Sequence, residues 1–284
     1  MSVLWDPQGR IRGPWVALFF AIVAVAGVLL VTALLAILGL LRYPELDSPR
    51  VVFLTLPTFL AGIGATLITW LALKEPTGLV DPKAPLRFLQ GFAAGGFALT
   101  VCCLVPLAVG ATSLHLTSAE PGHVVGSGLM QLFTLAPAGI GEELLLRGLG
   151  LQALRRGFGD GPAVAISSVV FGALHLFNPG SSWLAALLVA LVGAWFGAVT
   201  VRTGSVWMAM GLHVAWNFFE GFVFGQPVSG NTPGTSLFLA QGPSTAGFWS
   251  GGAFGPEAAG WTAVVLALSL ALTLALPRRS AALT

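Results

Sequence analysis

Charged side chains are scarce in this sequence of 284 residues. Asp, Glu, Lys and Arg make up 8% of the chain, against about 25% in an ordinary soluble domain, whereas hydrophobic residues make up 56%. So few charges cannot cover a water-soluble surface. The formal net charge of +2 provides no basic excess of the kind that binds nucleic acid. The composition therefore predicts a membrane protein without a nucleic-acid partner.

Cysteine is almost absent as well. The chain has two cysteines, Cys102 and Cys103, which are adjacent within an apolar run and therefore cannot join distant loops. We expect both to pack as small side chains inside a helix rather than to form a disulfide framework.

Long apolar stretches, by contrast, run through most of the chain. A helix that crosses a bilayer needs about 20 apolar residues, whereas the strands of outer-membrane barrels alternate over about ten. The sequence predicts helical spans at about 15–41, 51–73, 88–111, 124–155, 161–176, 183–201, 205–225 and 258–276. The predicted fold is an all-α, polytopic bundle of eight transmembrane helices.

The predicted spans divide the chain into three regions. Residues 1–123 hold the first three helices, residues 124–225 hold a core of helices four to seven, and residues 226–284 hold a loop and the final helix. The stretch 226–257 is rich in Gly, Pro, Ser and Thr, which is typical of a loop and not of a helix in lipid. We therefore expect it to lie outside the membrane.

Basic residues predict the orientation of the bundle, because cytoplasmic loops next to membrane helices are enriched in Lys and Arg. Of the thirteen basic residues, ten fall on one side of the membrane. Only Arg42 and Arg50 fall on the opposite side, and Arg147 lies within the fourth span. Both termini are thus expected in the cytoplasm. Ten of the thirteen basic residues fall on one side: Arg10, Arg12, Lys74, Lys83, Arg87, Arg155, Arg156, Arg202, Arg278 and Arg279.

Three charged residues lie inside the fourth predicted span, where a charge at mid-helix costs about 2.5–3.5 kcal/mol. Glu143 and Arg147 are four residues apart and share a helix face, so we expect them to form an ion pair that fixes this helix. Glu142 points about 100° away from Glu143 and would face a different neighbour, such as a hydrated cavity. A purely structural ion-pair network is the alternative, but it leaves Glu142 without a partner.

Polar side chains also interrupt two later spans. His175 lies near the end of the fifth span, and His213 precedes Asn217 by one turn in the seventh. The spacing places Glu220 on the same stripe as His213 and Asn217. Each histidine alone could serve as a hydrogen-bonding contact between helices. Together with a carboxylate, however, they offer a general base and donors for a developing oxyanion.

These residues form three motifs in the order of the chain: Glu142, Glu143 and Arg147 (E-E-x-x-x-R), Phe171 and His175 (F-x-x-x-H), and His213 and Asn217 (H-x-x-x-N). Over residues 129–220 the sequence resembles the CPBP (Abi) family of intramembrane proteases, which includes the type II CAAX prenyl endopeptidases. The resemblance implies eight helices around a cavity within the membrane.

The resemblance also implies a mechanism, which is hydrolysis of a peptide bond within the membrane. Glu142 would take a proton from the attacking water, and His175 would help to hold that water. His213 and Asn217 would donate hydrogen bonds to the oxyanion. Three further residues would support this site: Glu143, Arg147 and Phe171.

A metal-dependent variant of this chemistry stays open. Glu142, His175 and His213 could supply a zinc site of the His₂Glu type. The chain has no H-E-x-x-H motif, and the amide of Asn217 is a poor zinc ligand. We therefore expect no obligatory cofactor, with a divalent metal such as zinc as the alternative.

Other protease classes find weaker support. A G-x-G-D pattern at 157–160 is typical of presenilin-like aspartyl proteases, but it follows two arginines at a predicted turn, and no other Asp lies in a predicted span. Ser127, between two glycines, does not complete a serine-protease motif. We expect the glycine pairs Gly91/Gly95 and Gly193/Gly197 to allow close helix contact.

Two functions from other classes remain as alternatives. The intramembrane Glu and His residues could form a proton or ion relay in a transporter, although the chain has no inverted repeat. A non-catalytic scaffold or immunity protein would not need every motif position filled, as it is here.

The expected partners are the lipid bilayer and a peptide or protein substrate within it. The sequence selects neither a prenylated substrate nor an oligomeric state. Its abundance of Ala, Leu, Gly and Val, with few Lys, indicates a GC-rich bacterial genome. We therefore expect an integral protein of a bacterial plasma membrane.

Overall fold

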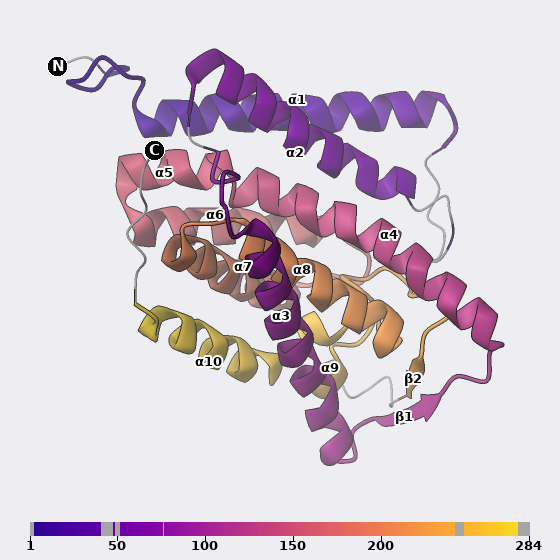
Figure 1. Ribbon diagram of the computed structural model, residues 1–284. Coiled ribbons are helices and arrows are strands. Elements are labelled where there is room, and N and C mark those ends of the chain that lie inside the picture. The colour runs from indigo at the N-terminus through magenta and orange to yellow at the C-terminus, as the bar shows by residue number, and fades with distance from the viewer. Residues whose placement is uncertain (1–2, 41–47, 49–51, 76, 242–246, 278–284) are drawn as a thin grey trace.

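Long apolar helices dominate the computed structural model, which describes residues 3–40, 48, 52–75, 77–241 and 247–277 (Figure 1). Within those residues, six helical stretches have the length and composition needed to cross a membrane. The helical membrane-protein fold is therefore confirmed. The six stretches are Gly13–Ile37 (α1), Thr55–Leu73 within α2 (Val52–Leu73), Ala84–Ala108 (α3), Pro121–Phe158 (α4 and α5), Asp160–Phe177 (α6 and η2) and Trp183–Thr203 (α7).

The last two predicted spans are shorter in the structure than in the prediction. The seventh is the α-helix Trp207–Phe218 (α8), which continues as a π-helix, Phe219–Val223 (η3). The eighth is Thr262–Ala275 (α10), because its predicted first residues form a 3₁₀ turn, Pro256–Ala258 (η4), and the connection after it. The count of eight membrane crossings therefore stays a prediction.

The fourth predicted span is not one continuous helix. Helix α4 (Pro121–Leu146) ends at Arg147, and a separate helix, α5 (Leu149–Phe158), begins after Gly148. A Cβ atom at Gly148 would lie 2.5 Å from the carbonyl oxygen of Leu144, so only glycine fits this close turn. The break lies where the motif arginine turns into the protein interior.

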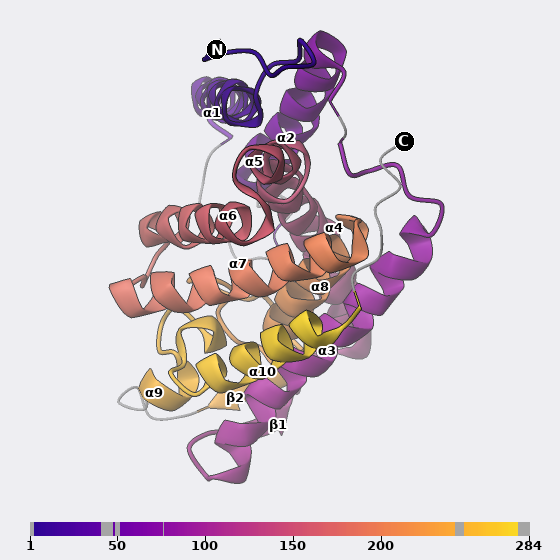
Figure 2. The same cartoon turned by 90° about the vertical axis from the view of Figure 1, so that its left-hand side faces the viewer.

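Helix α3 packs so closely along α8 that the two backbones are in contact at glycine positions. A Cβ atom at Gly91 would lie 2.0 Å from the Met208 carbonyl oxygen, and one at Gly211 would lie 2.0 Å from the Phe88 carbonyl oxygen. The predicted close contact at Gly91 is thus confirmed. Figure 2 shows the remaining layers, with α6 (Asp160–Leu174) beside α7 and α10 below α7. Polar residues of α4, α6 and α8 consequently meet inside the bundle.

The described residues of the stretch 226–257, which are 226–241 and 247–257, are a folded part of the protein body. Its strand Phe238–Gln241 (β2) pairs antiparallel with Ser113–Leu116 (β1), which joins it to the α3–α4 connection (Figure 1). A short helix, Gly247–Ser250 (α9), follows. Phe254 and Val228 are buried in the same stretch. The all-α prediction missed this two-stranded sheet, because its strands are four residues each and far apart in sequence.

Two of the predicted cytoplasmic basic residues join the ends of neighbouring helices. Arg156 pairs with Glu75 at 2.8 Å, and Arg87 Nη1 donates to the Thr203 carbonyl oxygen at 2.6 Å. These contacts support the prediction that their loops share one side. Which side is cytoplasmic stays a prediction. Four basic residues of that argument lie outside the described residues: Arg42, Arg50, Arg278 and Arg279.

Candidate active site

A fully buried ion pair forms the base of the site at the end of α4. Arg147 Nη1 lies 2.9 Å from Glu143 Oε1, and neither side chain is exposed. Arg147 Nη2 donates to the Gly193 carbonyl oxygen at 3.1 Å, and the guanidinium lies over the ring of Phe171 at 4.4 Å. The predicted pairing of Glu143 with Arg147 is confirmed. Helices α4, α6 and α7 are joined through this one arginine.

Gly193 makes room for that arginine. A Cβ atom at Gly193 would lie 2.9 Å from Arg147 Nη2 and 3.0 Å from the ring of Phe171. The sequence indicated only a helix contact at this glycine. The structure shows in addition that the position accommodates the buried guanidinium.

His213 lies against the same carboxylate. Its Nδ1 atom lies 2.9 Å from Glu143 Oε1, and its ring packs between those of Phe171 and Phe196. An ionised carboxylate only accepts hydrogen bonds, so Nδ1 carries the proton and Nε2 points the other way. Nε2 lies 3.8 Å from Glu142 Oε2. The two adjacent glutamates of α4 thus flank opposite sides of one imidazole.

Glu142 differs from Glu143 in its surroundings, as the sequence predicts. Its side chain is 28% exposed, whereas that of Glu143 is fully buried. The Oε2 atom of Glu142 is nevertheless inside the protein and has no hydrogen-bond donor. The 3.8 Å separation from His213 is too long for a hydrogen bond. The lone pairs of this oxygen are therefore free to accept a proton.

His175 is held at the end of α6, where it begins the 3₁₀ turn His175–Phe177 (η2). Its Nδ1 atom lies 2.8 Å from the carbonyl oxygen of Phe171, and the two rings meet edge to face at 4.6 Å. A carbonyl oxygen only accepts, so Nδ1 carries the proton and Nε2 is left as an acceptor. Phe171 thereby positions His175 and also stacks on the buried arginine.

Asn217 lies one turn after His213 on α8 and is buried, and its Oδ1 atom has no hydrogen-bond donor. Glu220 departs from the stripe that the sequence predicts. The α-helix ends at Phe218, and the π-helix that follows changes the spacing. The Glu220 carboxyl is fully buried and lies near Gly255, whose added Cβ atom would be 3.0 Å from Oε1.

Sequence reasoning missed Glu257, which it placed in the extramembrane loop. The side chain is buried, and the Ser229 hydroxyl donates a hydrogen bond of 2.5 Å to its Oε2 atom. The carboxyl interacts electrostatically with His175 and His213, and with Glu142. A lone glutamate directly before the last apolar run was the signal available in the sequence.

The arrangement does not match the predicted zinc alternative. Throughout the part of the chain that the structure describes, no three His, Cys, Asp or Glu side chains are grouped closely enough to hold a metal ion. The proposed ligands Glu142, His175 and His213 come from three elements, α4, η2 and α8. His213 Nε2 lies 3.8 Å from Glu142 Oε2.

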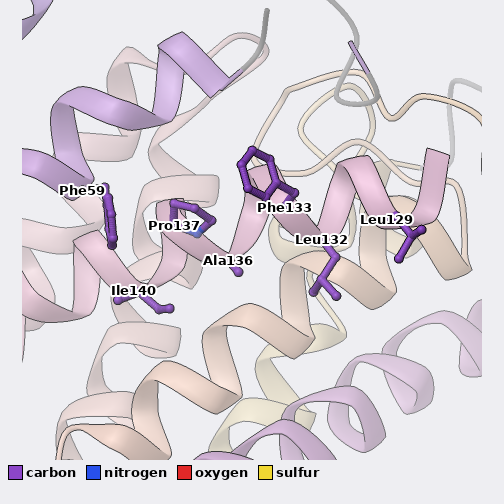
Figure 3. A pocket seen from close by; sticks show the side chains of 7 residues that line it. All are labelled: Phe59, Leu129, Leu132, Phe133, Ala136, Pro137 and Ile140. Carbon is purple, nitrogen blue, oxygen red and sulfur yellow. The ribbon is translucent and has the colours of Figure 1, made fainter. Parts of the chain in front are cut away.

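An apolar cavity of about 440 Å³ opens beside α4 (Figure 3). It is lined by Phe59 of α2 and by α4 side chains from Leu129 to Ile140, and contains almost no polar surface. Helices α2 and α4 approach closely just beyond it, where an added Cβ atom at Gly141 would lie 2.7 Å from the Phe59 Cα atom. Its last lining residue, Ile140, precedes Glu142 by two residues, which places the two side chains about 200° apart around the helix.

Comparison with known proteins identifies the segment that holds the motifs. Residues 125–219, about a third of the chain, match the family model described as type II CAAX prenyl endopeptidase Rce1-like. No curated protein matches the chain. The matched segment includes every motif residue and ends before Ser229 and Glu257. The family resemblance seen in the sequence is therefore confirmed.

Proposed function

We propose that this chain, with its type II CAAX prenyl endopeptidase Rce1-like segment, is an intramembrane protease that hydrolyses a peptide bond of a membrane-associated protein or peptide. One observation carries the proposal. The Glu142 Oε2 atom lacks a donor and lies 3.8 Å from His213, whose other nitrogen is fixed by Glu143. A free carboxylate oxygen beside an oriented imidazole is suited to general acid–base catalysis.

Glu142 acts as the general base in this proposal. Its Oε2 atom takes a proton from a water molecule, whose oxygen attacks the scissile carbonyl carbon. His175 Nε2 accepts the second hydrogen of that water, because Nδ1 is held by the Phe171 carbonyl oxygen. The glutamic acid then returns its proton to the leaving amine as the C–N bond breaks.

His213 and Asn217 stabilise the oxyanion. His213 Nδ1 already donates to Glu143, so Nε2 becomes a donor only when the ring carries a second proton. The Glu143 carboxylate stabilises that imidazolium. The amide nitrogen of Asn217 supplies the second donor. Loss of one such donor typically lowers the rate by about 100-fold to 1,000-fold.

The cavity beside α4 supports a substrate with an apolar portion. Its volume falls within the range of about 300–1,000 Å³ common for ligand sites, and its lining offers only dispersion and hydrophobic contact. We propose that it receives apolar side chains of the substrate or an attached prenyl chain.

The protein is an integral membrane protein, and we propose that it lies in a bacterial plasma membrane with both termini in the cytoplasm. A reporter fused to the C-terminus would test this orientation. Activity outside the cell would contradict it.

Cleavage of defined peptides by the purified protein tests the function. The substrate is a quenched fluorescent peptide that ends in a CAAX sequence, used with and without a farnesyl group on its cysteine. We expect cleavage by the unaltered protein and by the exposed-site control Glu120→Gln. Glu142→Gln should lose at least about 1,000-fold in kcat while it still inserts and folds. Full activity of that variant would end the assignment.

A further inference from the structure

A buried carboxyl that is hydrogen-bonded to the loop beside the His175 turn comes from outside the matched segment. Glu257 is 5% exposed and stands in η4, after the loop that begins at residue 226. Burial of a carboxyl without compensation is costly, so such groups are retained where partners or chemistry require them. Nothing in the mechanism above uses Glu257. Its position therefore calls for a role of its own.

Hydrogen bonds connect this carboxyl to the turn that carries His175. The Ser229 hydroxyl donates to Glu257 Oε2, and Asn178 Nδ2 donates to the Ser229 carbonyl oxygen at 3.1 Å. The backbone N–H of Asn178 in turn donates to the His175 carbonyl oxygen at 3.1 Å. The link runs from the Glu257 carboxyl to His175 through two residues, Ser229 and Asn178.

The backbone around Ser229 is held in an uncommon conformation. Ser229 has a φ of +46°, a region that residues other than glycine rarely occupy. The next residue, Gly230, donates its N–H to the Phe254 carbonyl oxygen at 2.8 Å and approaches the Pro179 carbonyl oxygen so closely that no Cβ atom would fit. A strained residue persists where its surroundings determine it. The loop is thus built to present the Ser229 hydroxyl at this point.

Electrostatic interactions also link the Glu257 carboxyl to His175. Burial raises the pKa of the Glu257 carboxyl, while His175, the Ser229 hydroxyl and His213 oppose that rise by favouring the charged form. Like-charge interactions involve Glu142 and Glu220. Among the surrounding charged groups, His175 exerts the largest effect on the carboxyl.

Resting on the proposed function, we propose that Glu257 is a positioning residue of the reaction. Its carboxylate, held by Ser229, acts through His175: it stabilises the positive charge that develops on the imidazole as Nε2 accepts a hydrogen from the attacking water, and it keeps Nε2 directed toward that water. The active site would then be formed by the helices of the matched segment 125–219 together with one wall, which consists of Ser229 and Glu257 of the loop 226–257. This role differs from those of Glu142 and Glu143, which lie on α4 next to His213.

Steady-state kinetics of Glu257→Gln in the full-length purified protein test this inference, with Ser229→Ala as a second variant and Glu120→Gln as the control. Gln keeps the size of the side chain and an acceptor for Ser229 but removes the charge. We expect kcat to fall about 10-fold to 100-fold, as for outer partners that orient functional histidines, with KM changed less than about threefold. Ser229→Ala should change kcat in the same direction by a smaller factor.

The outcomes separate this inference from the proposed function. If the unaltered protein cleaves the peptide and Glu257→Gln has the same kcat, the inference alone is overturned. A rise in KM without a fall in kcat would likewise overturn it, because a residue that acts through His175 affects the chemical step. If Glu257→Gln fails to fold, an unchanged kcat in Ser229→Ala overturns the inference, and a lowered kcat supports it. If the unaltered protein cleaves no peptide, the proposed function and the inference both fail.

Discussion

The Nδ1 atom of His213 lies 2.9 Å from the Oε1 atom of Glu143, although the two residues are 70 positions apart in sequence. The same oxygen accepts the hydrogen bond of Arg147. One buried carboxylate therefore neutralises the arginine and fixes the tautomer of the histidine. Its neighbour Glu142 is left with a free oxygen on the other side of that ring. Two consecutive glutamates thus have separate tasks.

These separate roles predict that two matched substitutions differ in their effect on the stability of the protein. Glu143→Gln leaves the buried guanidinium of Arg147 without its counter-charge, a change that typically costs about 3–5 kcal/mol of stability. Glu142→Gln removes a charge that has no ion pair with an arginine and should leave stability nearly unchanged. Thermal unfolding of both purified variants in one detergent measures the difference. Equal melting temperatures would contradict the assigned roles.

Asn217 should act on the chemical step. Asn217→Ala removes one proposed oxyanion donor, so kcat should fall about 100-fold to 1,000-fold with little change in KM. Peptide cleavage over a range of substrate concentrations separates the two constants. A rise in KM at constant kcat would assign Asn217 to substrate binding instead.

Gly193 should not tolerate a larger side chain. Gly193→Ala places a Cβ atom 2.9 Å from Arg147 Nη2, and such overpacking costs about 1–3 kcal/mol. The matched control is Gly126→Ala, on the exposed face of α4 with no atom within 4 Å of the added Cβ. That control should be neutral or slightly stabilising, because Ala favours helix. If both variants unfold at the same temperature as the parent, Arg147 is not confined at Gly193.

The buried Glu257 predicts a pH-dependent stability. Because burial raises the pKa of its carboxyl, the folded protein binds the proton more tightly than the unfolded chain. The stabilisation from this proton is complete below the pKa of an exposed glutamate and is lost as the pH rises through the higher pKa of the folded state. Glu257→Gln has no such proton to lose. Its melting temperature, relative to the parent, should therefore increase as the pH rises above the pKa of an exposed glutamate, and a constant difference would contradict the expected titration.

Chelation addresses metal dependence directly. Since Glu142, His175 and His213 do not form a compact ligand set, we expect peptide cleavage to persist after dialysis against a chelator. Added zinc should not raise the rate. Activity that is lost on dialysis and restored by one equivalent of zinc would reinstate the zinc hypothesis.

Hydropathy and motif spacing predicted the larger features of this protein. Apolar runs locate membrane helices because lipid selects composition over long stretches, and six of the eight predicted spans satisfy length and composition within the described residues. The break at Gly148 escaped prediction because its neighbours on both sides are good helix formers. Pairing of β1 with β2 escaped because it depends on a contact across more than 100 residues.

The site was predictable where its residues share a helix and not where they meet through the fold. Spacing of four residues predicted the pair of Glu143 and Arg147. The contact of Glu143 with His213 joins two helices, so no spacing within either helix reveals it. Glu257 was hidden by the composition of its loop, which indicated exposure, whereas the folded loop buries it beside the histidines.

The loop 226–257 is held at two places, by the pairing of its strand β2 with β1 and by the hydrogen bond of Ser229 to Glu257. It lies wholly beyond the segment 125–219 that defines the family match. Proteins grouped by that segment alone are thus free to differ in this wall. Exchanging the loop between two such proteins would offer a way to graft a new cleavage preference onto an untouched set of motifs.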